Sequence, residues 1–324
     1  MAITRSWRAA HHADGPYPAR AEDIPALNTV FSDAFTDRYR RDGLVGVSVP
    51  FLSPGIWRYA IEDADAGALL WRDERDEILA FNMVHASGAE GWMGPLAVRP
   101  DRQAGGLGKT VVRAGIDWLK HKGARTIGLE TMPRTMDNIG FYSALGFAPG
   151  RLTITVTLDA TIGDGAPYLL GRLGVREKAA ALRACRDLAE GLLPGYDFTR
   201  EIAITDRLAV GDTVLLWHGG KITGFALCHT VPLVEGRARE EIRVLKLVLA
   251  RRDDLGLMAR TLTDYARRMS AQRVALRVQT EYADAYARLI ALGGRVRWTD
   301  LRMTLAGYAE PTAAHGLVLS NWEI

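Results

Sequence analysis

Residues 96–109 read LAVRPDRQAGGLGK and lead into an amphipathic run. LAVRP is typical of a strand that ends at Pro100, because proline cannot donate to a strand ladder. After the glycines, apolar residues recur with helical spacing from Val112 to Leu119, and Gly123 is suited to end that helix. The stretch therefore predicts a strand, a glycine-rich turn and a helix.

The glycine-rich turn lies where the predicted helix begins. Backbone N–H groups are unpaired there and the helix dipole is positive, so a pyrophosphate can approach without meeting a Cβ atom. Positive charge beside the turn comes from Arg99, Arg102 and Lys109. A tight strand-to-helix connection without a ligand is the alternative. The spacing Gln-x-x-Gly-x-Gly, with Gln103 in place of a glycine at its first position, argues against dinucleotide and nucleoside-triphosphate folds.

A second motif follows after one strand, in TIGLETMPRTMDNIGFYSALGF at residues 126–147. Together the two stretches resemble the GNAT acyltransferase superfamily. Its pyrophosphate motif, Gln/Arg-x-x-Gly-x-Gly/Ala, is matched by Gln103, Gly106 and Gly108. Its following motif is matched by Asn138, Phe141, Tyr142, Gly146 and Phe147, in the same order and at a similar separation.

The resemblance implies an α/β fold with a mostly antiparallel central sheet flanked by helices, and acetyl-CoA as the acyl donor. The strand 96–98 is expected to be splayed from its neighbour and to pair with the pantetheine amides. The residues expected to bind the cofactor are Leu96, Ala97, Val98, Gln103, Ala104, Gly105, Gly106, Leu107, Gly108, Lys109, Asn138, Phe141 and Tyr142. The expected acceptor is an amine of a small molecule or peptide.

Composition narrows the class further. The 324 residues, 48% hydrophobic and 24% charged, suffice for two globular domains, and no segment is apolar enough to span a membrane. Cys185 and Cys228 are too few for a disulfide framework and indicate a cytoplasmic protein. A net charge of +3 without a basic block disfavours nucleic acid as a partner. No metal site is predicted, and a homodimer is left open.

The chain repeats itself. ILAFNMVH at residues 78–85 matches ITGFALCH at residues 222–229, each after a strand and a turn. We therefore expect two tandem domains of one fold, at residues 1–160 and 161–310, with a tail at 311–324. In the first domain, helical positions begin near Asp23 and a Gly/Pro-punctuated region follows at 43–57.

The second domain is expected to be degenerate. Aligned with the first, it carries Leu257 opposite Gly106 and Leu289 opposite Tyr142, and Asp253 or Asp254 places a carboxylate where a pyrophosphate would bind. We expect it to complete the active cleft or a shared sheet. The tail HGLVLSNWEI is apolar and β-prone, which predicts an added strand or a subunit contact with Trp322 buried.

Acyl transfer to an amine needs a proton donor for the leaving thiolate, and Tyr142 suits that role because a phenol is protonated at neutral pH. The resemblance places Glu130 as the base, with His85 or a water chain as alternatives. Residues suggested for the acceptor pocket are Trp57, Tyr59, His85 and Trp92. Two other functions stay open: a non-catalytic acyl-CoA sensor, and an acyl-CoA hydrolase or decarboxylase on the same fold.

Overall fold

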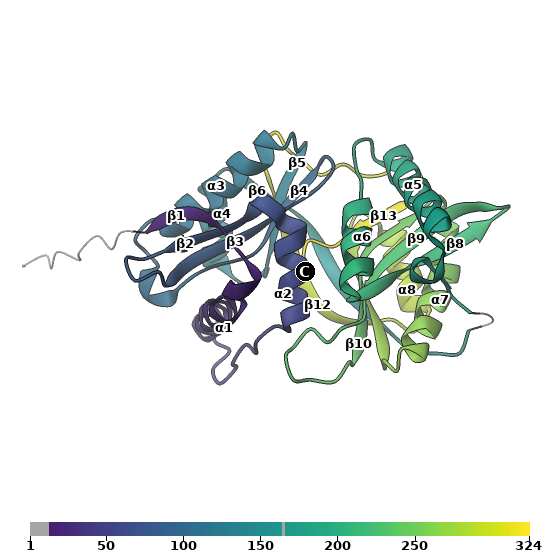
Figure 1. Ribbon diagram of the computed structural model, residues 1–324, viewed down its shortest axis with the longest axis horizontal. Helices are drawn as coiled ribbons and strands as arrows, with labels where there is room; N and C mark the ends of the chain where they lie inside the picture. The colour runs from purple at the N-terminus through teal and green to yellow at the C-terminus, as the bar shows by residue number, and fades with distance from the viewer. Residues whose placement is uncertain (1–12, 164–165) are drawn as a thin grey trace, which may run out of the picture.

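The structure is a computed structural model that describes residues 13–163 and 166–324. Its strands form one 13-stranded mixed sheet that runs through both halves of the molecule, which lie side by side with the C-terminus between them (Figure 1). No helix among the described residues has the length and apolar character needed to cross a lipid bilayer.

The described part of the first half contains four α-helices. They are α1 (Ile24–Arg41), α2 (Pro54–Ala64), α3 (Leu107–His121) and α4 (Met136–Ser143). Its strands are β1 (Asp14–Pro18), β2 (Ala68–Arg72), β3 (Ile78–Ser87), β4 (Glu90–Val98), β5 (Thr126–Thr131) and β6 (Phe147–Asp159). The predicted strand, glycine turn and helix are confirmed, and Gly123 lies just beyond α3 with φ +77°.

The second half repeats this order. Its helices are α5 (Val175–Leu192), α6 (Thr199–Leu208), α7 (Leu255–Arg268) and α8 (Ala283–Ala291). Its strands are β7 (Tyr168–Leu169), β8 (Gly211–His218), β9 (Lys221–His229), β10 (Glu241–Leu249), β11 (Arg273–Gln279), β12 (Arg295–Leu305) and the additional β13 (Leu317–Ser320). Because each element of the first half has a counterpart, the predicted internal repeat is confirmed.

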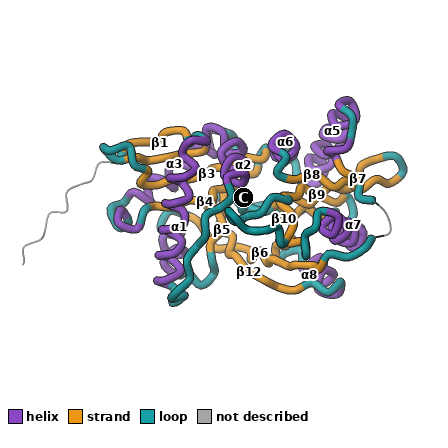
Figure 2. Tube along the Cα trace, turned by 60° about the horizontal axis from the view of Figure 1, so that its bottom comes forward, coloured by secondary structure: helices purple, strands orange, loops and turns teal. Residues whose placement is uncertain are grey.

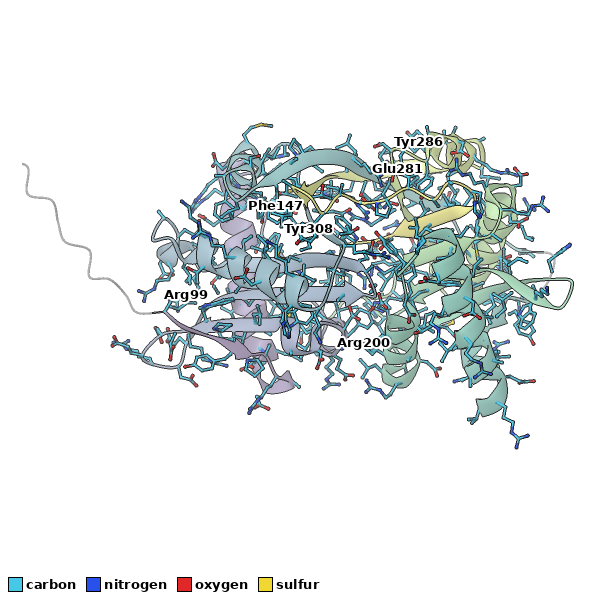
Figure 3. The ribbon with its side chains drawn as sticks, turned by 90° about the horizontal axis from the view of Figure 1, so that it is seen from above. Arg99, Phe147, Arg200, Glu281, Tyr286 and Tyr308 are labelled. Carbon is cyan, nitrogen blue, oxygen red and sulfur yellow. The ribbon has the colours of Figure 1, made fainter. Side chains whose placement is uncertain are left out.

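The two halves exchange their last strands. The strand order is β1-β2-β3-β4-β5-β12-β6-β11-β10-β9-β8-β7. Strand β12 of the second half therefore lies beside β5, whereas β6 of the first half lies beside β11. Figure 2 shows β12 and β6 together at the centre of the molecule. Phe147, where β6 begins, and Tyr308, just after β12, pack in the same apolar cluster (Figure 3). The halves therefore share one sheet, and a cut at residue 160 does not separate them in space.

Alternating side chains give each face of the sheet its own core. On β3, Phe81 and Met83 pack with α1 and α2, whereas Ala80 and Val84 pack with α3 on the opposite face. This period of two is the ordinary geometry of a strand that is covered on both faces. The second half is built in the same way, with α5 and α6 on one face and α7 and α8 on the other.

Candidate active site

The site begins at a fork between β4 and β5. The two strands are paired in parallel from Glu90↔Thr126 to Met93↔Leu129, and their pairing ends there. Beyond it, residues 96–98 of β4 remain paired with β3 on their other side, and Glu130 and Thr131 of β5 remain paired with β12. The fork therefore leaves one edge of β4 open toward the interior of the molecule.

The glycine-rich turn lies at the outer end of this fork. Gly106 is the N-cap of α3 with φ +88°, and a Cβ atom placed there would meet only open space. Gln103 donates from its side-chain nitrogen to the carbonyl of Val98 at 3.0 Å, which ties the turn to the end of β4. The start of α3 is thus fixed beside the fork, with its first N–H groups directed out of the helix.

Tyr142 reaches the same space from α4. Its side chain is buried, and Phe141 and Phe147 pack against the ring with centroids at 5.2 and 6.1 Å. Burial raises the pKa of the Tyr142 phenol well above its usual value. The phenol therefore stays protonated over the physiological range, although it is a weaker acid than an exposed tyrosine.

One cavity of about 1220 Å³ connects these elements. All the residues expected to bind the cofactor line it except Gly105 and Leu107. The far wall belongs to the second half and the tail, including Trp298, Asp300, Glu323 and Ile324. The wall of the cavity formed by the first half is therefore suited to a cofactor, and the wall formed by the second half and the tail is suited to another molecule.

The equivalent fork in the second half is filled by the chain itself. Strands β10 and β11 pair only over Glu241–Arg243 and Arg273–Ala275, after which β13 pairs antiparallel with β10 from Lys246↔Ser320 to Leu249↔Leu317. The predicted added strand is confirmed, and Trp322 is 1% exposed. Asp254 is the N-cap of α7, while the aligned Leu257 falls one turn farther along the helix.

Glu130 lies at the fork but is held in ion pairs. Its Oε2 accepts from Arg277 at 2.6 Å, and its Oε1 accepts from Arg302 at 2.8 Å and from the Thr153 hydroxyl at 2.5 Å. Burial by itself would raise the pKa of Glu130, but the two guanidinium groups outweigh it and the pKa is lowered. A carboxylate held this firmly is a poor proton acceptor, so we do not retain Glu130 as the base.

The other residues suggested by the sequence lie in the core. Trp57, Tyr59, His85 and Trp92 are at most 3% exposed, and none lines the cavity. His85 stacks on Trp92 at 4.0 Å, and its ring nitrogens contact Asp63 at 2.6 Å and the carbonyl of Gly94 at 3.2 Å. His85 therefore supports the backbone at the fork from behind and has no direct access to a ligand in the cavity.

A group of side chains near the fork was not foreseen. Arg277 of β11 donates to Glu130, to Asp300 of β12 at 2.8 Å and to Glu323 of the tail. Oxygen atoms of the three carboxylates lie within 4.8 Å of one another, and the guanidinium supplies positive charge among them. Strand exchange brings these residues together from distant parts of the chain, so no local sequence pattern predicts the group.

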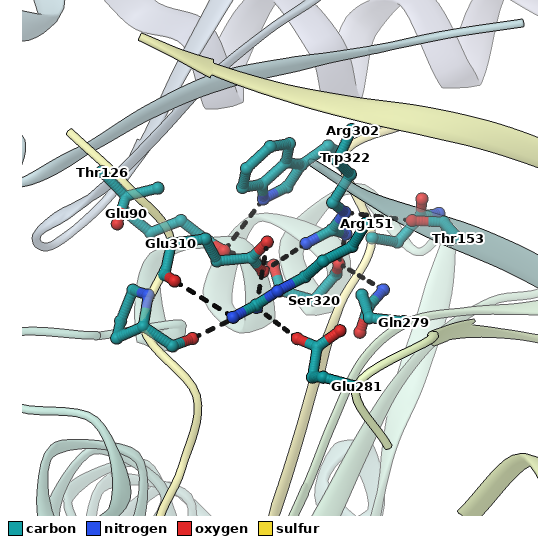
Figure 4. Close-up of polar contacts among 12 residues, drawn as sticks. Glu90, Thr126, Arg151, Thr153, Gln279, Glu281, Arg302, Glu310, Ser320 and Trp322 are labelled. Carbon is teal, nitrogen blue, oxygen red and sulfur yellow. Dashed lines mark hydrogen bonds and ion pairs between the residues drawn. The ribbon is translucent and has the colours of Figure 1, made fainter. Parts of the chain in front are cut away.

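Arg302, the neighbour of this group, anchors the tail (Figure 4). It donates to Glu310 and to the carbonyl of Ser320, and its guanidinium lies 4.0 Å from the centre of the Trp322 ring. Gln279 also donates to the carbonyl of Ser320, at 3.2 Å. These buried contacts hold residues 320–324 against the cavity.

Comparison with known proteins agrees with this geometry. Residues 30–147 match the family model described as the acetyltransferase (GNAT) family. The first half of the chain is a GNAT domain. A mycothiol acetyltransferase from Renibacterium salmoninarum is 37% identical over 89 residues, which are 26% of each chain. The matched segment thus spans about a quarter of that relative.

Solved structures extend the GNAT likeness to the whole chain. A Pyrococcus horikoshii protein proposed to be an acetyltransferase has a TM-score of 0.67 at 16% identity, covering 99% of this chain and 98% of its own. A tandem GNAT protein from the clavulanic acid biosynthesis pathway has a TM-score of 0.60 at 12% identity, covering 93% of this chain and all of its own. The chain therefore has the tandem GNAT fold.

Proposed function

We propose that this protein is an acyl-CoA-dependent N-acyltransferase that moves an acetyl group from acetyl-CoA to an amine of a small molecule or peptide. The observation that carries the proposal is the fork between β4 and β5, which opens into the same cavity as the glycine-rich start of α3. An extended thiol-bearing arm and a pyrophosphate need this pair of features: a free strand edge and an unobstructed helix N-terminus.

The residues fit coenzyme A in a way that supports the proposal. The open space at Gly106 accommodates phosphate oxygens, and Lys109 places a positive charge on the wall of the cavity. Bound acetyl-CoA would supply the thioester carbonyl and the thiolate leaving group. Backbone N–H groups of β4 at 96–98 would polarise the carbonyl, and Tyr142 would hold the proton that the thiolate receives.

The proposed units remain the repeats at 1–160 and 161–310 with the tail at 311–324. We assign cofactor binding to the first repeat alone, because β13 fills the fork of the second. The cytoplasmic location rests on the two cysteines, both of which are free and buried. A homodimer is a further possibility to test by sedimentation.

The test measures the release of coenzyme A from acetyl-CoA, detected with a thiol reagent. Small amines, amino acids, aminoglycosides and peptides are each offered as the acceptor. Acetyl transfer requires release that depends on an acceptor and an acetylated product seen by mass spectrometry. Release without any acceptor would instead show a hydrolase. Tight binding of acetyl-CoA by calorimetry with no turnover on any acceptor would favour the sensor function.

A further inference from the structure

Transfer to an amine needs a group that removes a proton from the ammonium form, because only the neutral amine has a free electron pair. No histidine lines the cavity among the residues that the structure describes. Glu130 accepts hydrogen bonds from three donors, two of which are guanidinium groups. The base must therefore be sought elsewhere on the cavity wall.

Asp300 is on that wall and lies next to the fork. It is 4% exposed, and its neighbour Leu301 on β12 pairs with Thr131, two residues beyond the last β5 residue paired with β4. Asp300 is thus close to the place where a thioester would lie if the pantetheine follows β4.

The hydrogen bonds of Asp300 leave it able to accept a proton. Its Oδ1 accepts from the indole nitrogen of Trp298 at 3.1 Å, and its Oδ2 accepts from Arg277 at 2.8 Å. Each carboxylate oxygen can accept two hydrogen bonds, so one position on each oxygen is uncommitted. Asp300 has one guanidinium partner where Glu130 has two.

We infer that Asp300, carried by the exchanged strand of the second half, is the general base that deprotonates the acceptor amine. The inference rests on the proposed acyl transfer and gives the second half a direct part in it. The first half would bind the donor, and the second half would receive the acceptor and take its proton.

The charges around Asp300 suit this role. Glu130 on β5 and Glu323 in the tail face it with negative charge, Arg277 on β11 faces it with positive charge, and Tyr39 on α1 lies within their field. Burial first, and then the charge of Glu323, raise the pKa of Asp300 to about 7, although Arg277 opposes them. An arriving ammonium would add positive charge to a group in which three carboxylates share Arg277.

The step balances without another reagent. Asp300 takes one proton from the ammonium, and the neutral nitrogen forms the new N–C bond at the thioester carbonyl. The C–S bond then breaks and the thiolate takes the proton of Tyr142, which is restored by the second proton leaving the nitrogen. Asp300 returns its proton to solvent, so the products are the amide, free coenzyme A and one proton.

The test is the pH profile of kcat for the full chain with an acceptor found in the amine screen. The wild type should lose activity below about pH 7 as Asp300 becomes protonated. D300N should lower kcat by roughly 10²- to 10⁴-fold, while D300E should recover part of it. D159N is the control, because Asp159 is an exposed aspartate at the end of β6 that does not line the cavity. A D300N enzyme with kcat within a few-fold of wild type would overturn the inference.

A second variant covers the case in which D300N does not fold. Trp298→Phe removes a hydrogen bond that lowers the pKa of Asp300, and Trp298 is 41% exposed, so the fold should tolerate the change. The acidic limb of kcat should move to higher pH, and a limb that stays in place would contradict the role of Asp300. Calorimetry with coenzyme A separates the two ideas. If the protein binds coenzyme A but the acidic limb does not move in Trp298→Phe, only the role of Asp300 is refuted. If the wild type does not bind coenzyme A, the proposed function is refuted.

Discussion

Trp322 donates its indole Nε1–H to Oε1 of Glu90 at 2.9 Å, joining two residues that are 232 positions apart. Glu90 is the first residue of β4 and is fully buried, and Lys246 of β10 lies 3.5 Å from its Oε2. The tail therefore connects two strands. One is β4, whose edge is open at the fork in the first half, and the other is β10, which pairs with β13 in the second half.

Gly128 makes this contact possible, which gives a first prediction. A Cβ atom at residue 128 would overlap the Trp322 ring and lie close to the carbonyl of Met303. Gly128→Ala should therefore displace the tail and lower the free energy of unfolding by about 1–3 kcal/mol, as overpacking does. Denaturant unfolding measures the change.

Gly191→Ala provides the matched control for Gly128→Ala. Gly191 lies near the end of α5, where a Cβ atom meets nothing within 4 Å, so alanine should leave stability unchanged or raise it slightly. Equal stability of the two variants would show that the position of Trp322 contributes little.

A second prediction concerns cofactor stoichiometry. One coenzyme A should bind per chain, because β13 occupies the second fork and Asp254 begins α7 with a carboxylate. Calorimetric titration should reach a ratio of one. A ratio of two would show that β13 gives way to the ligand.

A third prediction separates phosphate contact from backbone strain. Gly106 and Gly123 lie at opposite ends of α3, both have positive φ, and at both a Cβ atom would meet open space. Substituting either glycine by valine strains the backbone in a similar way. Gly106→Val should abolish coenzyme A binding, whereas Gly123→Val should only lower stability. Equal affinity in the two variants would remove the glycine turn from the site.

Local patterns were enough to predict much of the first half. The helical spacing after the glycines and the Gln-x-x-Gly-x-Gly turn correctly identified α3 and its position beside β4. The description of 43–57 as a Gly/Pro-punctuated region was incomplete, because Pro54 begins α2. Proline is favoured at the first turn of a helix and also in turns and loops, so the residue type could not distinguish them.

The far wall of the cavity could not be predicted in this way. Asp300 and Glu323 reach it only because β12 crosses to β5 and the tail returns between the halves. Strand exchange leaves the alternation of apolar and polar residues in each strand unchanged and alters only which strand lies beside it. That alternation shows which face of a strand is buried, but it does not show which strand is its neighbour. Trp57 and Tyr59 illustrate the converse: aromatic residues near the predicted site belong to the core.

A fourth prediction concerns pH and stability. Glu201 of α6 is 2% exposed, accepts from the hydroxyl of Ser87 and lies 3.9 Å from Lys246. Burial, and then the charge of Asp63, raise the pKa of Glu201 to about 8. The unfolded value is about 4.3, so between these pH values the folded protein binds more protons than the unfolded chain, and this contribution to stability is lost as the pH rises.

Glu201→Gln should therefore flatten the fall in stability between about pH 5 and pH 8, by at most about 1.4 kcal/mol per pH unit. Glu74→Gln, in the exposed turn before β3, should leave the slope unchanged. Urea unfolding at several pH values compares the variants with the wild type. A slope that Glu201→Gln does not alter would mean that Glu201 is ionised in the folded protein.

The last prediction concerns Tyr142 and distinguishes an enzyme from a binding protein. Tyr142→Phe keeps the ring that packs against Phe141 and Phe147 but removes the proton proposed for the thiolate. Turnover should fall by roughly 10²- to 10⁴-fold, while affinity for coenzyme A stays near that of the wild type. Steady-state kinetics with thiol detection and calorimetry measure the two quantities separately. Because burial raises the pKa of Tyr142, the wild-type activity should show no alkaline loss from this phenol below pH 10. If Tyr142→Phe keeps turnover within a few-fold of wild type, the thiolate takes its proton from water and Tyr142 serves only to shape the cavity.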